Sequence, residues 1–196
     1  MTLSLQCDSS YDPNFLTDAQ SQALFQWLTE HFDLSQPETI TMGDGSESEI
    51  LPWKVNLLEP ELAQSGQFGW FHGRQQPWFP LIEQIHQRLT ALTGLVFPVC
   101  VCLYYPDGEE WMDFHCDLPA FGSTNVIPSL SIGAKRTFLI RNTQDHQEVH
   151  SLELANGSLF VMGEGFQSRY QHAVPRASEG AGPRFNLTFR QFDQIL

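Results

Sequence analysis

The sequence predicts an α+β protein in which N-terminal helices support a double-layered β core. Two helix-like segments lie before residue 94, and eight short apolar runs, separated mostly by turn residues, follow it. The chain of 196 residues has the length of one domain, and its 41% hydrophobic content is enough for a packed core. We therefore expect a single domain over residues 1–196, in which two helices pack against a β sandwich or barrel.

The first helix is predicted over residues 17–32. Thr17 and Gln20 stand three apart, as in a capping box at a helix start. One face of this helix carries Ala23, Leu24, Trp27, Leu28 and His31. The second helix is predicted over residues 79–92, with Pro80 in its first turn and Gly94 at its C-terminal cap. The apolar residues expected on its buried side are Ile82, Ile85, Leu89 and Leu92.

Between the two helices the pattern is irregular. Residues 34–50 are polar and rich in Gly and Ser, which predicts a mobile loop. Residues 51–78 show no clear periodicity, and their tryptophans, Trp53, Trp70 and Trp78, are expected in the core rather than as stacking platforms for bases. The predicted strands after residue 94 cover 99–105, 111–115, 127–132, 136–140, 148–154, 159–162, 170–174 and 185–192.

Charge is distributed unevenly along the chain. The net charge is −13, and residues 1–114 carry all of this excess, whereas residues 115–196 are neutral overall. This balance argues against strong non-specific binding of nucleic acid, whose affinity comes largely from neutralised phosphates. This balance does not exclude a local basic groove formed by the neutral residues 115–196.

The sequence also bears on the cellular compartment. No apolar run reaches the ~18–20 residues of a membrane-spanning helix, and the N-terminus lacks the pattern of a signal peptide. The cysteines are Cys7, Cys100, Cys102 and Cys116, and the close pair on one predicted strand is poorly placed for a bridge. Reduced thiols and a cytoplasmic location are the simplest expectation.

A His-x-Asp pattern occurs twice in the sequence. His31 and Asp33 end a helix, where residues two apart do not face each other, whereas His115 and Asp117 end a strand, where they do. Iron(II) oxygenases hold their metal with two histidines and one carboxylate on one face. Taken alone the second pair is also compatible with a solvated turn, and a third ligand must come from elsewhere in the chain.

The last predicted strand alternates strictly between polar and apolar residues. Arg184, Asn186, Thr188 and Arg190 fall on one face and Phe185, Leu187 and Phe189 on the other. If the polar face is enclosed, its arginines need an anion, and a dicarboxylate such as 2-oxoglutarate would supply one. An exposed edge strand paired with acidic neighbours is the alternative.

Taken in order, these residues resemble the AlkB-like Fe(II)/2-oxoglutarate dioxygenases. The family pattern is H-x-D, then a distal His, then R-x-N-x-T-x-R, and here it is met by His115, Asp117, His172 and residues 184–190. Residues 129–138, 157–163 and 77–80 resemble three further family segments. The resemblance covers about residues 68–192, with residues 1–67 as an N-terminal helix and lid-like extension.

The resemblance implies a fold, a site and an activity. The fold is a double-stranded β-helix, or jelly roll, and the iron ligands and catalytic centre are His115, Asp117 and His172. The residues implied in 2-oxoglutarate binding are Tyr105, Arg184, Asn186, Thr188 and Arg190. The implied activity is oxidative demethylation of alkylated nucleobases in DNA or RNA, as in DNA repair, with Fe(II), 2-oxoglutarate and O2. Its products would be formaldehyde, succinate and CO2.

Departures from the family pattern bear on the substrate. Leu103 stands where many members have Asn, residues 118–121 lack the usual acidic residues, and the lid segments 50–54 and 69–74 are poor in basic residues. Candidate substrate contacts are Trp70, His72, Arg74 and Arg141. The cations expected near the site mouth are Lys54, Arg74, Lys135, Arg136, Arg141, Arg169 and Arg176. A monomer acting on single-stranded or flipped bases is expected, with no membrane partner; the alternative is a same-fold oxygenase of a protein or small molecule.

Overall fold

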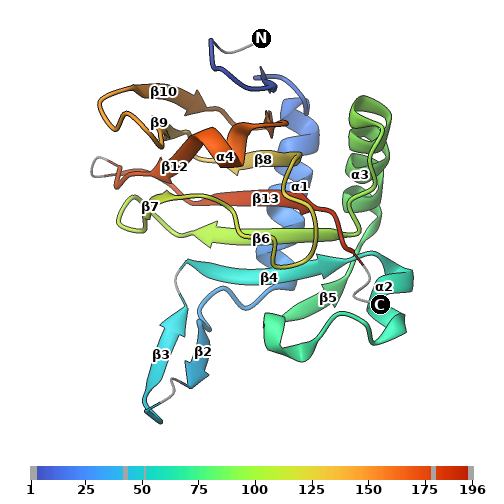
Figure 1. Ribbon diagram of the computed structural model, residues 1–196. Coiled ribbons are helices and arrows are strands. Elements are labelled where there is room, and N and C mark those ends of the chain that lie inside the picture. The colour runs from blue at the N-terminus through green and yellow to red at the C-terminus, as the bar shows by residue number, and fades with distance from the viewer. Residues whose placement is uncertain (1–3, 42–43, 51, 178–179, 194–196) are drawn as a thin grey trace.

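Two β sheets face each other in the computed structural model, which describes residues 4–41, 44–50, 52–177 and 180–193 (Figure 1). The larger sheet has the order β1 (Ser9–Asp12), β11 (Ser158–Met162), β8 (Ile127–Gly133), β13 (Arg184–Arg190), β6 (Val99–Tyr105), β4 (Trp53–Leu58) and β5 (Gln75–Pro77). The smaller sheet has the order β10 (Val149–Leu154), β9 (Arg136–Asn142), β12 (Tyr170–Val174) and β7 (Met112–His115). Within the described residues β5 joins β4 in parallel and the other pairs are antiparallel. This is the layered β core that the sequence predicts.

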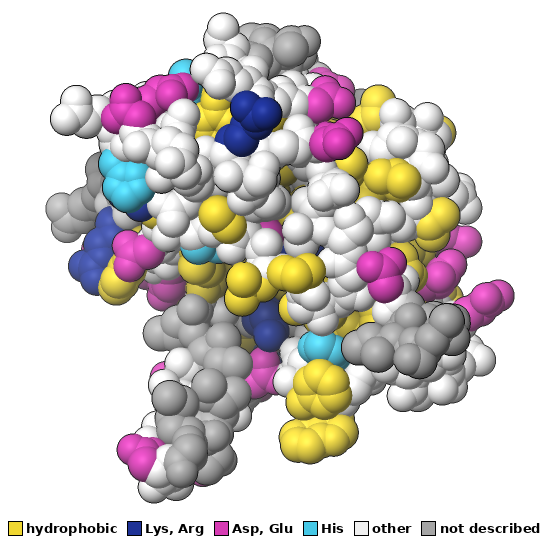
Figure 2. Space-filling view, viewed as in Figure 1, with side chains coloured by type: hydrophobic (Ala, Val, Ile, Leu, Met, Phe, Trp, Pro, Cys, Tyr) yellow, Lys and Arg dark blue, Asp and Glu magenta, His cyan; other side chains and the backbone are white. Residues whose placement is uncertain are grey.

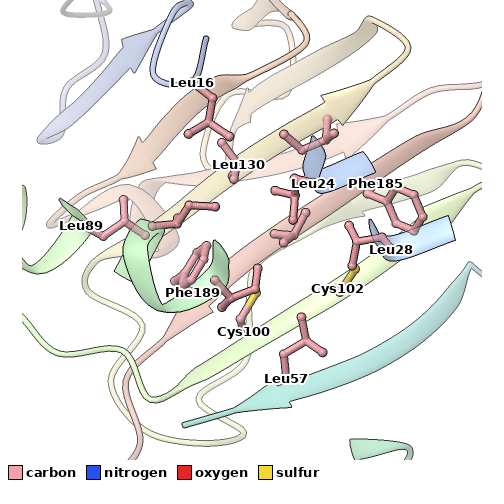
Figure 3. Close-up of a cluster of buried hydrophobic side chains, with 14 of the residues drawn as sticks. Leu16, Leu24, Leu28, Leu57, Leu89, Cys100, Cys102, Leu130, Phe185 and Phe189 are labelled. Atoms are coloured by element: carbon pink, nitrogen blue, oxygen red, sulfur yellow. The ribbon is translucent and has the colours of Figure 1, made fainter. Parts of the chain in front are cut away.

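Two long helices, α1 (Asp18–His31) and α3 (Pro80–Thr93), lie on the outer side of the larger sheet (Figure 1). Apolar side chains of both helices pack against one face of the sheet, as Figure 3 shows for Leu24, Leu28 and Leu89 beside Phe185 and Phe189. The period-two alternation of β13 explains why its other face remains free for polar groups. The helices therefore fix the sheet from behind, and the site lies between the two sheets.

The helix ends follow the predicted signals. Thr17 Oγ1 accepts a hydrogen bond from Gln20 N at 3.3 Å, and Gln20 Oε1 accepts from Thr17 N at 3.0 Å, which completes the capping box. Gly94 ends α3 in the left-handed conformation at φ 73°, which favours glycine. Leu92, expected to be buried, is 60% exposed, because the packing face of α3 runs through Ile82, Ile85, His86 and Leu89.

The segment between the helices differs most from the prediction. Instead of a loop over residues 34–50, β2 (Glu38–Thr41) and β3 (Glu47–Ile50) form an antiparallel hairpin that projects from the body (Figure 1). Residues 42–43 of that predicted loop, and Leu51 in the following segment, lie outside the described residues. The composition of this stretch resembles a loop because an exposed, two-stranded hairpin needs no apolar face.

The irregular segment 51–78 is also more ordered than expected. It contains β4, α2 (Pro60–Ser65), a 3-10 turn η1 (Trp70–His72) and β5. Trp53 is buried and Trp78 packs at the edge of the core, as predicted, whereas Trp70 is 85% exposed. The reason is local, since η1 follows a glycine on a connection that leaves the sheet before returning as β5. No helix in the described parts of the chain is long and apolar enough to cross a membrane.

Candidate metal and cosubstrate site

Three side chains converge between the sheets. His115 ends β7 and lies opposite His172 in the antiparallel register of β12, while Asp117 follows two residues after His115. One potential ligand atom from each of the three lies within 4.8 Å of the others, and this is the one such group in the described part of the chain. The structure therefore brings together His115, Asp117 and His172, the residues that the H-x-D pair and the distal histidine suggest as metal ligands.

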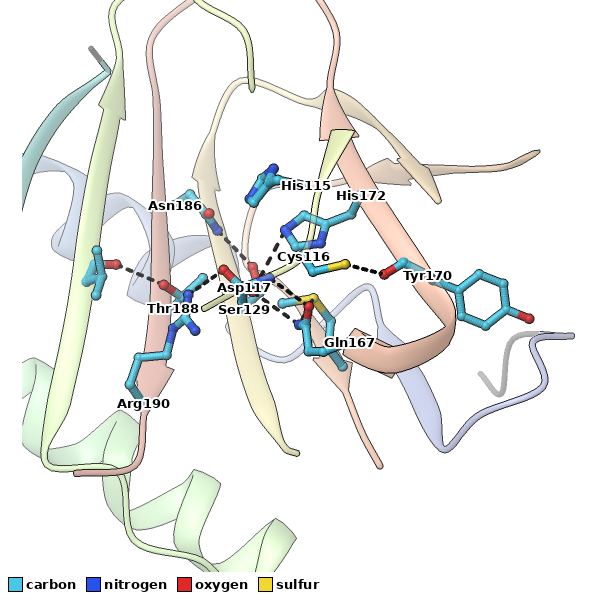
Figure 4. A network of polar contacts seen from close by, with 12 residues as sticks. His115, Cys116, Asp117, Ser129, Gln167, Tyr170, His172, Asn186, Thr188 and Arg190 are labelled. Atoms are coloured by element: carbon cyan, nitrogen blue, oxygen red, sulfur yellow. Dashed lines mark hydrogen bonds and ion pairs between the residues drawn. The ribbon is translucent and has the colours of Figure 1, made fainter. Parts of the chain in front are cut away.

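Neighbouring groups hold these three side chains in place (Figure 4). His115 donates from Nδ1 to the carbonyl of Asp113 at 2.7 Å, which leaves Nε2 as the nitrogen with a free lone pair. Gln167 donates to Asp117 Oδ2 at 3.2 Å and accepts from the Asp117 backbone N–H at 2.8 Å. Arg190 Nη2 lies 2.6 Å from Asp117 Oδ1. Such supporting contacts fix the orientation of metal ligands.

The electrostatics favour metal binding by these groups. Burial lowers the pKa of His172 to about 4, although the Asp117 carboxylate acts in the opposite direction. Burial acts to raise the pKa of Asp117, but Arg190 and the two histidines outweigh it and hold that pKa below its usual value. A neutral imidazole and an ionised carboxylate are the forms that bind a metal ion.

At the other end of the same cavity lies a buried cation. Arg184 is 1% exposed, donates from Nη2 to Ser131 Oγ at 3.0 Å, and places its guanidinium carbon 5.2 Å from the centre of the Tyr105 ring. Burial lowers the pKa of Arg184 to about 10 and raises that of Tyr105. No carboxylate in the described residues forms an ion pair with Arg184.

The remaining polar residues of β13 line the space between these two ends. Asn186 donates to Ser129 Oγ at 2.9 Å and to the Leu130 carbonyl at 3.2 Å, and Thr188 donates to the Val101 carbonyl at 3.4 Å. Both are thus engaged with neighbouring strands, and Arg190 is engaged with Asp117. The polar face is enclosed, which excludes the exposed edge strand considered from the sequence.

These residues fit iron and a dicarboxylate. Two histidines with one carboxylate are a donor set suited to Fe(II). Among the described residues, Arg184 Nε and Nη1 and Arg190 Nε are buried without a hydrogen-bond partner. Buried donors of this kind are costly unless a partner arrives, so an anion between the two arginines would satisfy them.

A second, larger cavity of about 730 Å³ is lined by segments close in sequence to this site. Its walls include Phe71, His72, Phe121 and Phe192, and its lining residues 119–123 begin two residues after Asp117 in the chain. His72 packs against Phe121 with ring centroids 4.9 Å apart. The neighbouring Trp70 projects into solvent from the same turn. Two of the expected substrate contacts therefore lie at or next to an aromatic-lined opening.

The expected basic contacts are placed differently. Arg74 donates to the carbonyl of Gln36 at 2.8 Å and lies over the Trp53 ring, so it anchors the β2–β3 hairpin. Arg141 lies on the face of β9 opposite Phe138 and Ile140, where it binds Gln171 and covers the Phe114 ring. On the face seen in Figure 2, basic side chains are few and separated.

Arg136 also departs from expectation. We expected it among the accessible cations at the mouth, yet it is 1% exposed. Its guanidinium is bound to backbone carbonyls inside the molecule. Arg136 lies on the same face of β9 as the buried Phe138 and Ile140, so the period of two already points it inward, although an arginine looks like a surface residue by type.

Several residues of the site escaped the sequence analysis. Gln167 holds Asp117, Ser131 binds Arg184, and Phe138 stacks on His172 with centroids 5.3 Å apart. Ser129 and Ser131 alternate with apolar residues along β8, which was an available signal for a polar, inward face. Gln167 lies on the short helix α4 (Phe166–Arg169), and no sequence pattern links it to Asp117.

Comparison with known proteins agrees with this geometry. Residues 8–190 match the family model described as the 2OG-Fe(II) oxygenase superfamily. The mouse alpha-ketoglutarate-dependent dioxygenase alkB homolog 3 is 32% identical over 163 residues, covering 71% of this chain and 57% of that protein. The bovine DNA oxidative demethylase ALKBH2 is 33% identical over 126 residues, covering 59% of this chain and 45% of that protein. The chain thus spans about half the length of these curated relatives.

A solved structure supports the fold. "The structure of OsALKBH1" superimposes with a TM-score of 0.62 at 17% identity, covering 96% of this chain and all of that one. The predicted jelly roll with supporting helices is confirmed, as is the resemblance to AlkB-like oxygenases. The family match begins at residue 8, well before the segment 68–192 in which the resemblance was visible.

Proposed function

Because the chain belongs to the 2OG-Fe(II) oxygenase superfamily, we propose that it is an oxidative demethylase that removes alkyl groups from nucleobases in DNA or RNA, as in DNA repair. One observation carries the proposal: the group of His115, Asp117 and His172 lies at one end of a cavity whose other end holds Arg184 and Tyr105. A metal site and an anion site in one enclosed space are what this chemistry requires.

In this proposal His115, Asp117 and His172 hold Fe(II), and Arg184 with Tyr105 binds the distal carboxylate of 2-oxoglutarate. Asn186 and Thr188 fix the pocket wall through their bonds to neighbouring strands. Arg190 keeps Asp117 ionised and oriented. With O2, the bound iron and cosubstrate supply the oxidation of a C–H bond, with release of succinate, CO2 and, from an N-methyl group, formaldehyde. The protein orients the reactants and excludes water.

A nucleobase substrate is supported by the relatives and by the larger cavity. The bovine relative is named a DNA oxidative demethylase. The walls formed by Phe71, His72 and Phe121 offer flat aromatic surfaces in a cavity whose lining begins two residues after Asp117. Enzymes that act on bases receive them unstacked from single strands or flipped from a duplex. Trp70 and His72 are therefore proposed to contact the substrate.

Several basic side chains are already bound to protein groups, and this favours a second candidate function, an oxygenase of a protein or small molecule. Lys54 donates to the His72 carbonyl at 3.2 Å, and Lys135 and Arg176 are paired with acidic residues, both at 3.5 Å. Few cations are therefore free to meet a phosphate backbone. The first candidate has the stronger support, because the sequence similarity extends across most of the domain.

The experiment is an assay of succinate and formaldehyde with the Fe(II)-loaded protein. Its arms are a methylated single-stranded oligonucleotide, the same sequence unmethylated, a methylated duplex, a protein extract and a metabolite pool. Formaldehyde released with succinate only in the presence of the methylated strand supports the demethylase. Succinate stimulated by protein or metabolites, with no formaldehyde from methylated strands, supports the second candidate instead.

A cytoplasmic location and a monomeric state are further proposals. All four cysteines are free, as suits a reducing compartment. Cell fractionation tests the location, and the elution volume in size-exclusion chromatography tests the oligomeric state. Elution at twice the mass of 22.3 kDa would contradict the monomer.

A further inference from the structure

Arg136 is a buried cation that the proposed chemistry does not use. It begins β9, and its guanidinium donates to three backbone carbonyls, those of Asp107 at 2.9 Å, Glu110 at 2.8 Å and Pro175 at 2.8 Å. These acceptors belong to two connections that are distant in sequence. The two connections are also joined by a hydrogen bond from Ala177 N to the Gly108 carbonyl at 2.9 Å. One side chain thus holds two loops to a strand end.

The two loops begin next to residues that line the end of the cavity where the anion is expected. The first follows Tyr105 at the end of β6, and the second follows Val174 at the end of β12; both residues line the cavity. Arg184 lies opposite Tyr105 in the register of β13 and β6. The guanidinium carbon of Arg136 lies 5.5 Å from the centre of the Tyr105 ring and that of Arg184 lies 5.2 Å from it. Both arginines therefore fix the position of this one ring.

The cost of this arrangement indicates a purpose beyond packing. Arg136 and Arg184 are both 1% exposed, and like charges held near one ring repel each other in a poorly screened interior. The acidic groups that act on Arg136 are Glu110 and Asp107, and neither forms an ion pair with it in the described residues. An anion that enters the cavity would be attracted by the positive charges of both Arg136 and Arg184.

We propose that Arg136 is a positioning residue for the cosubstrate, which sets the depth of the carboxylate pocket formed by Tyr105 and Arg184 and so restricts it to a five-carbon 2-oxo diacid. The inference rests on the proposed use of 2-oxoglutarate. Lysine cannot replace Arg136, because a single ammonium lacks the planar fork that reaches three carbonyls at once.

The test compares binding of 2-oxoglutarate with that of 2-oxoadipate, which is one methylene longer. Binding is measured by calorimetry without O2, using protein loaded with Mn(II), so that no turnover is required. For Arg136→Lys we expect about tenfold weaker binding of 2-oxoglutarate, the effect of losing bonds from a charged donor. We also expect the ratio of the two affinities to fall toward one, a change that general destabilisation does not produce. Lys135→Met, at the neighbouring exposed position, is the matched control.

Hydrogen exchange on the wild-type protein keeps the test decisive if Arg136→Lys does not fold. Binding of 2-oxoglutarate to the Mn(II)-loaded protein should slow amide exchange in residues 107–110 and 176–177. Unchanged selectivity in a folded Arg136→Lys variant, or unchanged exchange in both loops, would overturn the role of Arg136. Failure of the wild-type protein to bind 2-oxoglutarate at all would instead overturn the proposed function.

Discussion

Asp117 is the residue on which the most contacts of the site meet. It faces two histidines, accepts from Gln167 and pairs with Arg190, although its side chain is only 11% exposed. A carboxylate that is buried and still ionised must be compensated on every side. The side chains around Asp117 are therefore consistent with the H-x-D pair at residue 115 as the proposed metal site, whereas at residue 31 His31 is exposed and stacks on Trp27.

Substitution of the proposed ligands tests which of the two H-x-D pairs binds the metal. His115→Ala and Asp117→Ala should each abolish binding of one Fe(II) per chain, because two remaining donors hold the ion too weakly. The measurement is anaerobic Fe(II) titration, followed by the visible absorption that appears on adding 2-oxoglutarate. His31→Ala and Asp33→Ala are the matched controls and should bind iron normally. Undiminished iron binding in both His115→Ala and Asp117→Ala would refute the assignment.

Arg184 tests the anion end of the cavity. Arg184→Ala should weaken 2-oxoglutarate binding by about a hundredfold or more, since losing one partner of a buried charged pair costs roughly 3–5 kcal/mol. Arg184→Lys should recover part of the affinity, because a point charge replaces a fork. Arg176→Ala, which removes an exposed arginine paired with Glu109, should have no effect. Near-normal affinity in Arg184→Ala would exclude the role.

At the scale of elements, the bounds of a strand were predicted where its sequence shows a clear apolar or alternating pattern. The strands β6 and β12 are largely apolar runs that end before a proline, and they have the predicted bounds; β13, which alternates strictly, differs by one or two residues. The β2–β3 hairpin and β4 were missed. The sequences of the hairpin strands are mostly polar, which resembles a loop. In β4, Trp53, Val55 and Leu57 do alternate with Lys54 and Asn56, a period-two signal that the prediction overlooked.

The capping box of α1 permits a quantitative test at this scale. Thr17→Ala should destabilise the protein by about 1 kcal/mol, the usual cost of losing an N-cap side chain. For a domain of this size that loss corresponds to a fall in Tm of roughly 2–4 °C. Thr17→Ser should keep most of the stability, and Gln22→Ala, at an exposed position inside the helix, is the control. Equal stability of Thr17→Ala and wild type would show that the cap contributes nothing.

At the scale of the whole molecule, the site depends on segments that no local pattern joins. The larger cavity is lined by residues from 67–72, 119–123 and 192–193, which the fold brings together. The sequence identified the proposed ligands through a spaced motif, but it placed Arg136 at the mouth when it lies inside. A motif preserves the order of functional residues, whereas the exposure of a side chain depends on which distant loops cover it.

The distribution of charge predicts how the protein meets nucleic acid. Net charge is −13, and the basic side chains Lys54, Arg74, Lys135, Arg141 and Arg176 already have protein partners. We therefore expect roughly two to four phosphate contacts and a log–log salt slope of about −1.4 to −2.8 for a single strand. Duplex binding should be weak at physiological salt.

Two charge reversals locate the nucleic acid on the surface. A salt titration of binding to a methylated single strand is repeated with Arg74→Glu and Arg141→Glu. Arg74 already donates to the Gln36 carbonyl, but it lies two residues from His72 at the larger cavity, so its reversal should weaken binding and reduce the slope by at most about 0.7, the contribution of one phosphate. Arg141 lies on the outer face of the smaller sheet, and its reversal should leave the slope unchanged. A slope steeper than about −4 would require more phosphate contacts than these cations provide. No binding at low salt, together with rapid turnover of 2-oxoglutarate, would favour a protein or small-molecule substrate.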